Sequence, residues 1–339
     1  MKAVQMDHYN KQRRIVLRDV PIPTPTGTQV LIWVKAAAVN PLDLLTLSGE
    51  VRLLQPASLP VTLGNECAGV IVQTGRQVSN FQPGDRVYTR LPVGQGGAFA
   101  GYVAVDQNAV ANMPAGYDFP TAAALPLAGL TAYQGLTEEL NVQPGQTLLL
   151  PGGSGSLGQV AVPIAKALGL RVLVTGSGQA RDRLLALGAD GHLDYRRENY
   201  WETWSGVDCA MDTLGPGEFA HELSVLKPGG RLLSLRTGPN RAFARRHRVS
   251  PLKRGLFTLA GLRYGHAAHK QGKTYRFLFV RADGAQLRAV TKIVEEHAIR
   301  PQVDERVFSL AQAGEALQLV AQGGAHGKII LQPEQEDIK

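Results

Sequence analysis

The stretch Leu148–Gly169, LLLPGGSGSLGQVAVPIAKALG, decides how the rest of the chain is interpreted. Gly153, Gly155 and Gly158 match the pattern G-x-G-x-x-G, which is weak by itself. Here the glycines follow an apolar run typical of a strand and precede one typical of a helix. In that context, residues without a Cβ atom let backbone N–H groups approach a pyrophosphate, and the helix N-terminus favours the anion. The stretch therefore predicts a phosphate-binding loop. The alternative is a tight structural turn.

The segments around this loop alternate between strand-like and helix-like patterns. Runs such as RVLVTGS and GVDCAMDTLG are typical of strands, and ARDRLLALGAD and FAHELSVLKPGG between them are typical of helices. This alternation predicts a parallel sheet covered by helices on both faces. Just before it, TAAALPLAGLTAYQGL predicts a helix that begins at a Thr121 cap.

The first third of the chain follows a different pattern. Short apolar runs, QVLIWVKAAAVN and ECAGVIVQTG among them, are separated by Pro- and Gly-containing turns. This predicts an irregular, partly closed β domain. The fold class is therefore α/β: an irregular β domain joined to a doubly wound parallel sheet.

Composition narrows the function classes. With 339 residues, 44% of them hydrophobic and 19% charged, the chain fits a globular protein of about two domains. No apolar run reaches the roughly 18 residues that a membrane span needs, and the N-terminus lacks the apolar core of a signal peptide. Cys67 and Cys209 alone do not make a disulfide framework, so we expect a reducing, cytoplasmic setting.

Much of the net charge of +8 lies in RAFARRHRVSPLKRG, residues 241–255. The simplest interpretation is a solvated surface segment. Contact with anionic lipid headgroups or nucleic acid, or steering of an anionic cofactor, stays open. Only Phe243 and Phe257 lie nearby, so a surface that stacks single-stranded nucleic acid is not expected.

The end of the strand-like run that follows the glycine loop, RVLVTGSG, predicts the cofactor. A site for NAD usually has Asp or Glu here to bind both ribose hydroxyls. This chain has Gly176 and Ser177, followed by Arg181 and Arg183. Missing negative charge beside guanidinium groups suits a 2′-phosphate and predicts NADPH. The alternative is that both arginines are solvated residues on a helix face.

Motifs along nearly the whole chain resemble one family. VNPLDLLTLSG, LGNECAGVIVQTG, FQPGDRVY, LPLAGLTAYQGL, LGADGHLDYR, LKPGGRLLSL and GAHGKIIL, in this order around the glycine loop, resemble the medium-chain dehydrogenase/reductase superfamily, in its zinc-independent quinone oxidoreductase and enone reductase branch. The resemblance implies a GroES-like catalytic domain from residues 1–122 and 284–339, and a Rossmann-type domain from residues 123–283. It also implies a homodimer joined through the edge of the Rossmann sheet.

The resemblance implies a set of cofactor-binding residues. Asn40 and Thr131 would lie near the nicotinamide and its ribose, where they are positioning candidates, and Tyr195 would lie beside the 2′-phosphate. Lys328 is a further candidate. The other positions are Gly152, Gly153, Ser154, Gly155, Ser156, Leu157 and Gly158 for the pyrophosphate, Gly176, Ser177 and Arg181 for the adenosine half, and Leu214, Gly215, Phe279 and Val280 along the cofactor.

Metal ligands are missing from the matching motifs. The cysteine ligand of zinc-dependent relatives falls at Asn40, and their Gly-His-Glu reads here as Gly64, Asn65 and Glu66. Since a catalytic zinc needs three such ligands, we expect no metal ion.

Leu45 stands where several relatives have an aromatic residue in the substrate pocket, so no tyrosine proton donor is predicted there.

These features predict an NADPH-dependent reductase of quinones or of the C=C bond of α,β-unsaturated carbonyls. Hydride addition to such an acceptor needs no Lewis acid, and the protein mainly has to position the nicotinamide in a dry site. Two alternatives remain: an enzyme like the zinc-type alcohol dehydrogenases, and a protein that binds NADPH without turnover.

Overall fold

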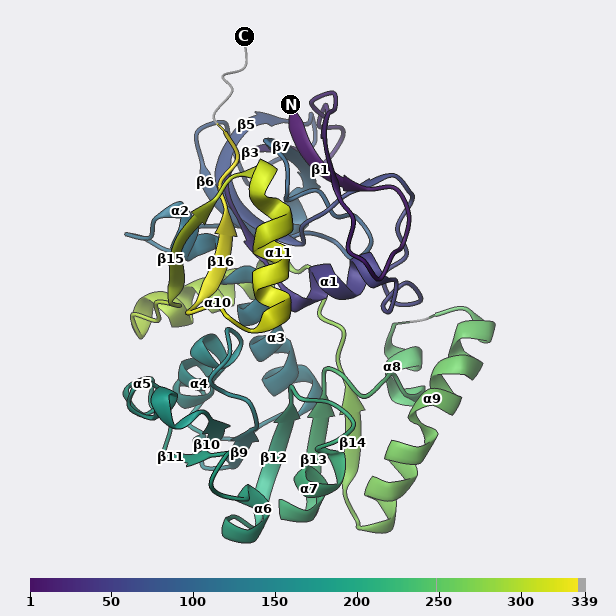
Figure 1. The fold of residues 1–339 in the computed structure, drawn as a ribbon, viewed down its shortest axis with the longest axis vertical. Helices are drawn as coiled ribbons and strands as arrows, with labels where there is room; N and C mark the ends of the chain where they lie inside the picture. Colours follow the sequence, from purple (N-terminus) through teal and green to yellow (C-terminus); the bar gives the residue numbers. More distant parts are fainter. Residues whose placement is uncertain (248, 335–339) are drawn as a thin grey trace. The chain divides into compact units, whose positions relative to one another are not determined.

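The computed structural model describes residues 1–247 and 249–334. Arg248, in the basic stretch, lies outside the described residues. The chain forms two compact units, whose courses are followed in Figure 1. Unit 1 comprises Met1–Leu130 and the chain from Arg281 onward, and unit 2 comprises Thr131–Val280.

Unit 2 is built on a six-stranded sheet with the strand order β11-β10-β9-β12-β13-β14, in which all neighbours are parallel. The strands are β9 (Thr147–Leu150), β10 (Arg171–Gly176), β11 (Gly191–Asp194), β12 (Val207–Asp212), β13 (Leu226–Ser234) and β14 (Thr274–Phe277). The helices between them are α4 (Gly158–Ala167), α5 (Arg181–Ala186), α6 (Tyr200–Thr203), α7 (Phe219–Val225), α8 (Arg241–Arg246) and α9 (Pro251–Lys270). The predicted parallel sheet is confirmed.

The strand order reverses direction between β9 and β12. From β9 the chain runs outward through β10 to β11, then returns to the other side of β9 and continues through β12, β13 and β14. In open parallel sheets, ligands bind at the carboxyl ends of the strands beside such a reversal. The glycine loop follows β9, directly at this point.

Unit 1 carries the irregular β domain. A sheet of three strands has the order β2-β1-β4, and a sheet of seven has the order β15-β16-β3-β5-β6-β8, with β7 also paired to β3. Its strands are β1 (Lys2–Met6), β2 (Val16–Asp19), β3 (Gln29–Val39), β4 (Val61–Thr62), β5 (Glu66–Thr74), β6 (Arg86–Arg90), β7 (Tyr102–Asp106), β8 (Val110–Asn112), β15 (Val303–Phe308) and β16 (Lys328–Leu331). Its helices are α1 (Pro41–Ser48), α2 (Phe119–Ala123), α10 (Gly284–Glu296) and α11 (Ala313–Gln322), and α3 (Pro126–Gln134) continues into unit 2.

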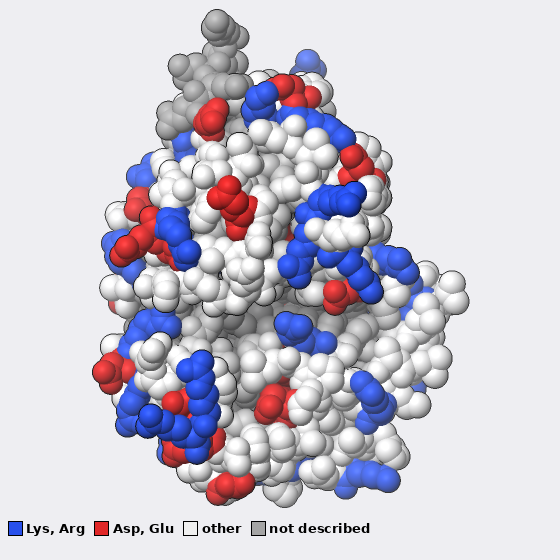
Figure 2. All heavy atoms as spheres, in the orientation of Figure 1, with Lys and Arg blue, Asp and Glu red and all other residues white. Residues whose placement is uncertain are grey.

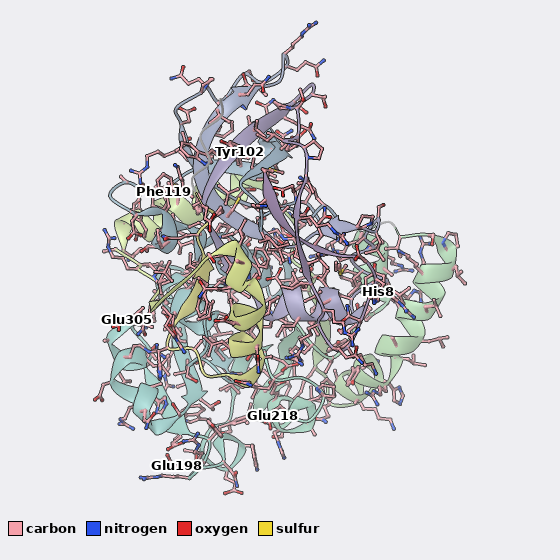
Figure 3. All side chains as sticks on the ribbon, turned by 45° about the horizontal axis from the view of Figure 1, so that its top comes forward. His8, Tyr102, Phe119, Glu198, Glu218 and Glu305 are labelled. Atoms are coloured by element: carbon pink, nitrogen blue, oxygen red, sulfur yellow. The ribbon has the colours of Figure 1, made fainter. Side chains whose placement is uncertain are left out.

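Strand β3 holds unit 1 together. It pairs with β5, β7 and the C-terminal β16, so strands from the first third and from the end of the described chain share one sheet (Figure 1). Its side chains from Ala36 to Val39 are all buried. On the β7 side, Trp33 stacks on Tyr102, which is labelled in Figure 3, with ring centroids 6.4 Å apart.

The single helix predicted from Thr121 is wrong. The segment forms two helices, α2 and α3, which separate before Pro126. Proline has no N–H group for the helical hydrogen bond and disfavours the helical conformation of the residue before it. The cap is Asp118, whose Oδ1 accepts a hydrogen bond from the Thr121 N–H at 2.9 Å.

Two further helices, α10 and α4, can be compared with their sequence patterns. Helix α10 buries Leu287, Val290 and Val294 on one face, as its spacing predicts. Helix α4 runs through Pro163 without ending there. Over the part of the chain that the structure describes, no helix is both long enough and apolar enough to cross a membrane.

Candidate functional site

The site candidates of unit 2 gather at one edge of its sheet. Because β9–β14 are parallel, the segments that follow them leave the sheet on the same side. We call this side the carboxyl edge: the segments 151–157, 177–180, 195–199, 213–218 and 278–280, which follow β9, β10, β11, β12 and β14.

The loop after β9 is held by the neighbouring strand. The Gly152 N–H donates to Thr175 Oγ1 at 3.1 Å, and the Gly153 N–H donates to the Thr175 carbonyl at 2.9 Å. Gly152 has φ of +70°, which favours glycine. A Cβ atom at Gly158 would lie 1.9 Å from the Gly153 carbonyl oxygen, so the start of α4 can pack on the loop only through glycine.

Gly155 differs from these glycines because no neighbouring side chain or backbone atom would exclude a larger residue there. Within the described chain, a Cβ at Gly155 would have one non-adjacent atom within 4 Å, the Gly152 carbonyl oxygen at 3.6 Å, and Gly155 is exposed. Its position at the tip, before the first turn of α4, is where backbone can approach a phosphate. In that turn the Gln159 N–H donates to the Gly155 carbonyl at 3.3 Å and the Val160 N–H donates to the Leu157 carbonyl at 3.1 Å, so the turn packs back on the loop. The loop therefore fits a pyrophosphate.

The end of β10 lies against the same loop. A Cβ at Gly176 would lie 3.0 Å from the Cβ of Ser154. Arg183, on α5, donates from Nη2 to the Ser154 carbonyl at 3.0 Å. Ser177 follows in extended conformation and leads into the short turn Gly178–Ala180. Arg183 thus supports the loop.

Arg181 and Tyr195 lie beside this turn. The Tyr195 N–H donates to the Gly176 carbonyl at 3.3 Å, and the Tyr195 side chain is 58% exposed. Arg181 is exposed as well, and burial together with the Arg181 charge holds the pKa of His192 on β11 below its ordinary value. Figure 2 shows the blue side chains of this region gathered over α5 and β11.

Other charged groups, which the sequence patterns did not single out, lie here. Asp194 ends β11, and its Oδ2 would lie 2.7 Å from a Cβ at Gly178. Two exposed arginines, Arg196 and Arg197, follow within three residues, ahead of Glu198, which is labelled in Figure 3. The basic character of HLDYRR was visible in the sequence, but its proximity to Gly178 comes from the pairing of β10 with β11.

The loop after β12 is held by Asp212, a second missed residue. Its Oδ1 accepts hydrogen bonds from the N–H groups of Leu214 at 2.8 Å and Gly215 at 2.7 Å. Its Oδ2 accepts from Ser234 Oγ at 2.5 Å. The Leu214 side chain is 49% exposed, and a Cβ at Gly152 would lie 2.8 Å from it. The loops after β9 and β12 therefore lie side by side at the strand-order reversal.

The last candidates of unit 2 lie at its two ends. Phe279 is half-buried and Val280 is 8% exposed, both just after β14. Thr131 is 7% exposed on α3. A few residues later, a Cβ at Gly135 would lie 2.8 Å from the Met211 side chain, so this segment packs on the sheet.

Asn40 and Lys328 lie in unit 1, in a buried polar network completed by Asp43, Asn65 and Glu66. Lys328 Nζ donates to Asn40 Oδ1 and lies 2.9 Å from Glu66 Oε1. Asn40 Nδ2 donates to the same Glu66 oxygen at 2.8 Å, and Asn65 Nδ2 donates to Asp43 Oδ1 at 2.6 Å. None of the five residues is more than 4% exposed.

The start of α1 joins the two halves of the network. The Asn40 N–H donates to Asp43 Oδ2 at 2.7 Å, and Pro41 opens the helix, where its missing N–H costs nothing. Burial raises the pKa of Asp43 to about 7, against the hydrogen bonds from Asn40 and Asn65, which lower it. Nearby, burial lowers the pKa of Arg90 to about 10.

The network occupies the positions where zinc-dependent relatives would have ligands. The side chains at these positions contact other residues of the network. Lys328 contacts both Asn40 and Glu66, and Asn65 donates to Asp43. Among residues 1–247 and 249–334, no group of three or more His, Cys, Asp or Glu side chains could hold a metal ion. Asn40 and Asn65 offer only amides, and the Glu66 carboxylate is paired with the Lys328 ammonium group, so these positions lack the thiolate and imidazole ligands of a zinc site.

Family models match two long segments of the chain. Residues 26–115 match the alcohol dehydrogenase GroES-like domain. Residues 187–331 match the zinc-binding dehydrogenase model. The first lies in unit 1, and the second spans the end of unit 2 and the C-terminal part of unit 1.

Individual proteins are similar along most of the chain. The 2-methylene-furan-3-one reductase of Solanum lycopersicum is 31% identical over 98% of this chain and 79% of its own length. The quinone oxidoreductase of Homo sapiens is 33% identical over 69% of this chain and 72% of its own. The structure of the quinone oxidoreductase from Coxiella burnetii superposes with a TM-score of 0.83 at 28% identity, covering 98% of this chain and 99% of that one.

Proposed function

The chain belongs to the medium-chain dehydrogenase/reductase superfamily, among quinone oxidoreductase and enone reductase relatives, and from that premise we propose that it is an NADPH-dependent reductase. The acceptor is a quinone or the C=C bond of an α,β-unsaturated carbonyl. The observation that carries the proposal is Gly155, whose missing side chain leaves room that the described protein does not fill.

Bound NADPH would supply the hydride, and the residues of unit 2 would bind and orient it. Gly155 and the first turn of α4 take the pyrophosphate. Arg181 and Tyr195, both exposed beside Gly176, take the 2′-phosphate, and Arg183 supports the loop instead. Leu214 and Gly215, fixed by Asp212, line the path of the cofactor, and Thr131, Phe279 and Val280 contact its nicotinamide half.

In unit 1, Asn40 acts as a positioning residue. Its Nδ2 donates to both Glu66 and the Ala38 carbonyl, and its Oδ1 accepts from Lys328, so the amide is held from both ends. Contacts at both ends of the amide fix the rotamer of this side chain. Lys328 acts through Asn40 in the same way.

Family models of alcohol and zinc-binding dehydrogenases match this chain, but the residues of the candidate site favour neither alternative. An alcohol dehydrogenase of the zinc type would need ligands where the polar network binds itself. A protein that binds NADPH without turnover would keep the carboxyl edge but oxidise no cofactor.

The experiment follows NADPH absorbance with purified protein, small enones and an ortho-quinone, in the presence of a metal chelator. We expect turnover that survives the chelator and is slower with NADH. Turnover lost with chelator and restored by zinc would favour the alcohol dehydrogenase. Tight NADPH binding without oxidation by any acceptor would favour the binding protein.

The proposed enzyme is also a homodimer and is found in the cytoplasm. β14 forms one end of the six-stranded sheet, and pairing of two such edges would build a homodimer. Both cysteines are buried and unbridged, which suits a reducing cytoplasm. Light scattering of the purified chain tests the dimer.

A further inference from the structure

Helix α9 has two apolar faces, and the rest of the described chain covers one of them. Phe257, Gly261, Tyr264 and Ala268 form the buried face. The contact there is close: a Cβ at Gly261 would lie 2.5 Å from the Cβ of Asn240. This spacing of four, three and four residues is typical of a helix packed along one side.

The opposite face carries leucines in water. Leu252 is 77% exposed, Leu256 46%, Leu259 69% and Leu262 60%. Spaced by four, three and three residues, they form one stripe, which we call the leucine stripe, along the outer side of the helix. Single exposed leucines are ordinary, but an aligned set on one helix indicates an interaction surface.

The chain segment that carries the leucine stripe has charges of one sign. Between Glu222 and Asp283 the sequence contains no Asp or Glu, and every charged residue is Lys or Arg, apart from histidines. On α9 itself Arg254, Arg263 and Lys270 are exposed. On the face shown in Figure 2, the part of the surface that α9 forms carries white and blue side chains and no red ones.

We propose that α9 docks on an anionic membrane surface. The helix would lie in the plane of the headgroups, with the leucine stripe among the first carbons of the acyl chains and its basic side chains on lipid phosphates. The same charge argues against a second copy of this chain as the occupant. Two α9 helices packed through their leucines would face basic side chains with basic side chains, which costs free energy.

The test is co-sedimentation of the full chain with vesicles. One set contains phosphatidylcholine alone, and the other contains equal parts of phosphatidylcholine and phosphatidylglycerol. We expect binding to the anionic set, little binding to the neutral set, and loss of binding as salt rises. The double variant L252Q/L259Q should lower the partition coefficient by about tenfold or more, since two large apolar side chains no longer enter the lipid.

Matched variants separate docking from a general loss of structure. V307Q replaces an apolar residue of β15 that is 63% exposed, and it should bind vesicles like the wild type. R254E/K270E keeps the leucines but reverses two charges, and it should also lose roughly tenfold or more in partitioning. All three variants should keep the wild-type unfolding temperature and NADPH oxidation in solution.

Three results would overturn the proposal. The wild type could stay in the supernatant with the anionic vesicles, or L252Q/L259Q could bind them as the wild type does. A third is that L252Q/L259Q converts a dimer to a monomer in light scattering without vesicles, which would assign the leucine stripe to a second copy of the chain.

Discussion

The polar network of unit 1 and the carboxyl edge of unit 2 contrast in how their polar groups are satisfied. In the network, Asn40, Glu66 and Lys328 find their partners inside the protein and lie out of contact with water. At the carboxyl edge, Gly155 and Arg181 are exposed, and the space at Gly155 is left open. Polar groups that bind one another inside the protein stabilise its fold, whereas exposed groups beside open space can bind a ligand. Changes in the first should therefore affect unfolding, and changes in the second should affect cofactor use.

The largest effect is expected for Lys328→Met. The substitution keeps the length of the side chain but removes the ammonium group that lies 2.9 Å from the buried Glu66 carboxylate. Losing one partner of a buried pair costs about 3–5 kcal/mol. Urea unfolding measures the loss, followed by fluorescence of Trp33, which lies in unit 1, in a background with Phe at Trp201 and Trp204.

The matched control for this prediction is K328M/E66Q. It removes both charges, so it should be less destabilised than K328M alone. If K328M unfolds within about 1 kcal/mol of the wild type, the network is not the self-satisfied region that the comparison requires.

Gly155→Val tests the opposite region. Its added atoms would occupy the open space at the loop tip, where a phosphate would bind, with little contact to the protein. We expect kcat/KM for NADPH to fall by about a hundredfold, as for a misplaced cofactor, with little change in unfolding temperature. Gly265→Val, at a helical glycine whose Cβ would meet nothing within 4 Å, is the matched control and should leave kcat/KM unchanged. A G155V protein with normal NADPH kinetics would mean that the loop is a structural turn.

The third prediction concerns Asp43 and pH. Its pKa is raised by burial from 3.8 to about 7 in the folded protein, so the folded state holds a proton that the unfolded state has released. The stability from this group is complete below pH 3.8 and is lost as pH rises through about 7. The free energy of unfolding should be about 2 kcal/mol larger at pH 5 than at pH 7.5 from this group.

Asp43→Asn should remove this pH dependence. The amide can still accept the hydrogen bond from the Asn40 N–H, and it carries no proton that titrates. The readout is again Trp33 fluorescence in urea, at both pH values. An equal slope with pH in D43N and wild type would show that the carboxyl is ionised in the folded protein.

The sequence predicted the fold well, but for the candidate site it named single residues and not the contacts between them. The glycine loop and the alternating segments were enough for the parallel sheet, because both are local patterns. The wrong prediction of one helix from Thr121 also came from a local pattern. There Asp118 caps the first helix and Pro126 begins the second. The network joins Asn40 to Lys328 across 288 residues, and no periodicity could reveal that contact.

Two other features were hidden for different reasons. Helix α9 is apolar on opposite faces, so the leucine stripe and the buried face cancel as a periodic signal. The structure distinguishes Arg183 from Arg181 by a single hydrogen bond, which Arg183 donates to the Ser154 carbonyl. In the sequence the two arginines are equivalent members of one helix.

That equivalence gives the last and smallest prediction. Arg181→Ala should lower kcat/KM for NADPH by roughly tenfold, the value of one charge-assisted hydrogen bond to phosphate, and leave the low activity with NADH unchanged. Arg183→Ala should reduce activity with both cofactors in the same proportion, because the Ser154 carbonyl loses its donor and the pyrophosphate loop loosens. The ratio of NADPH to NADH activity in the two variants is the measurement. If R183A changes that ratio and R181A does not, the 2′-phosphate binds Arg183. The arginine that contacts the Ser154 carbonyl would then also be the one that binds the cofactor.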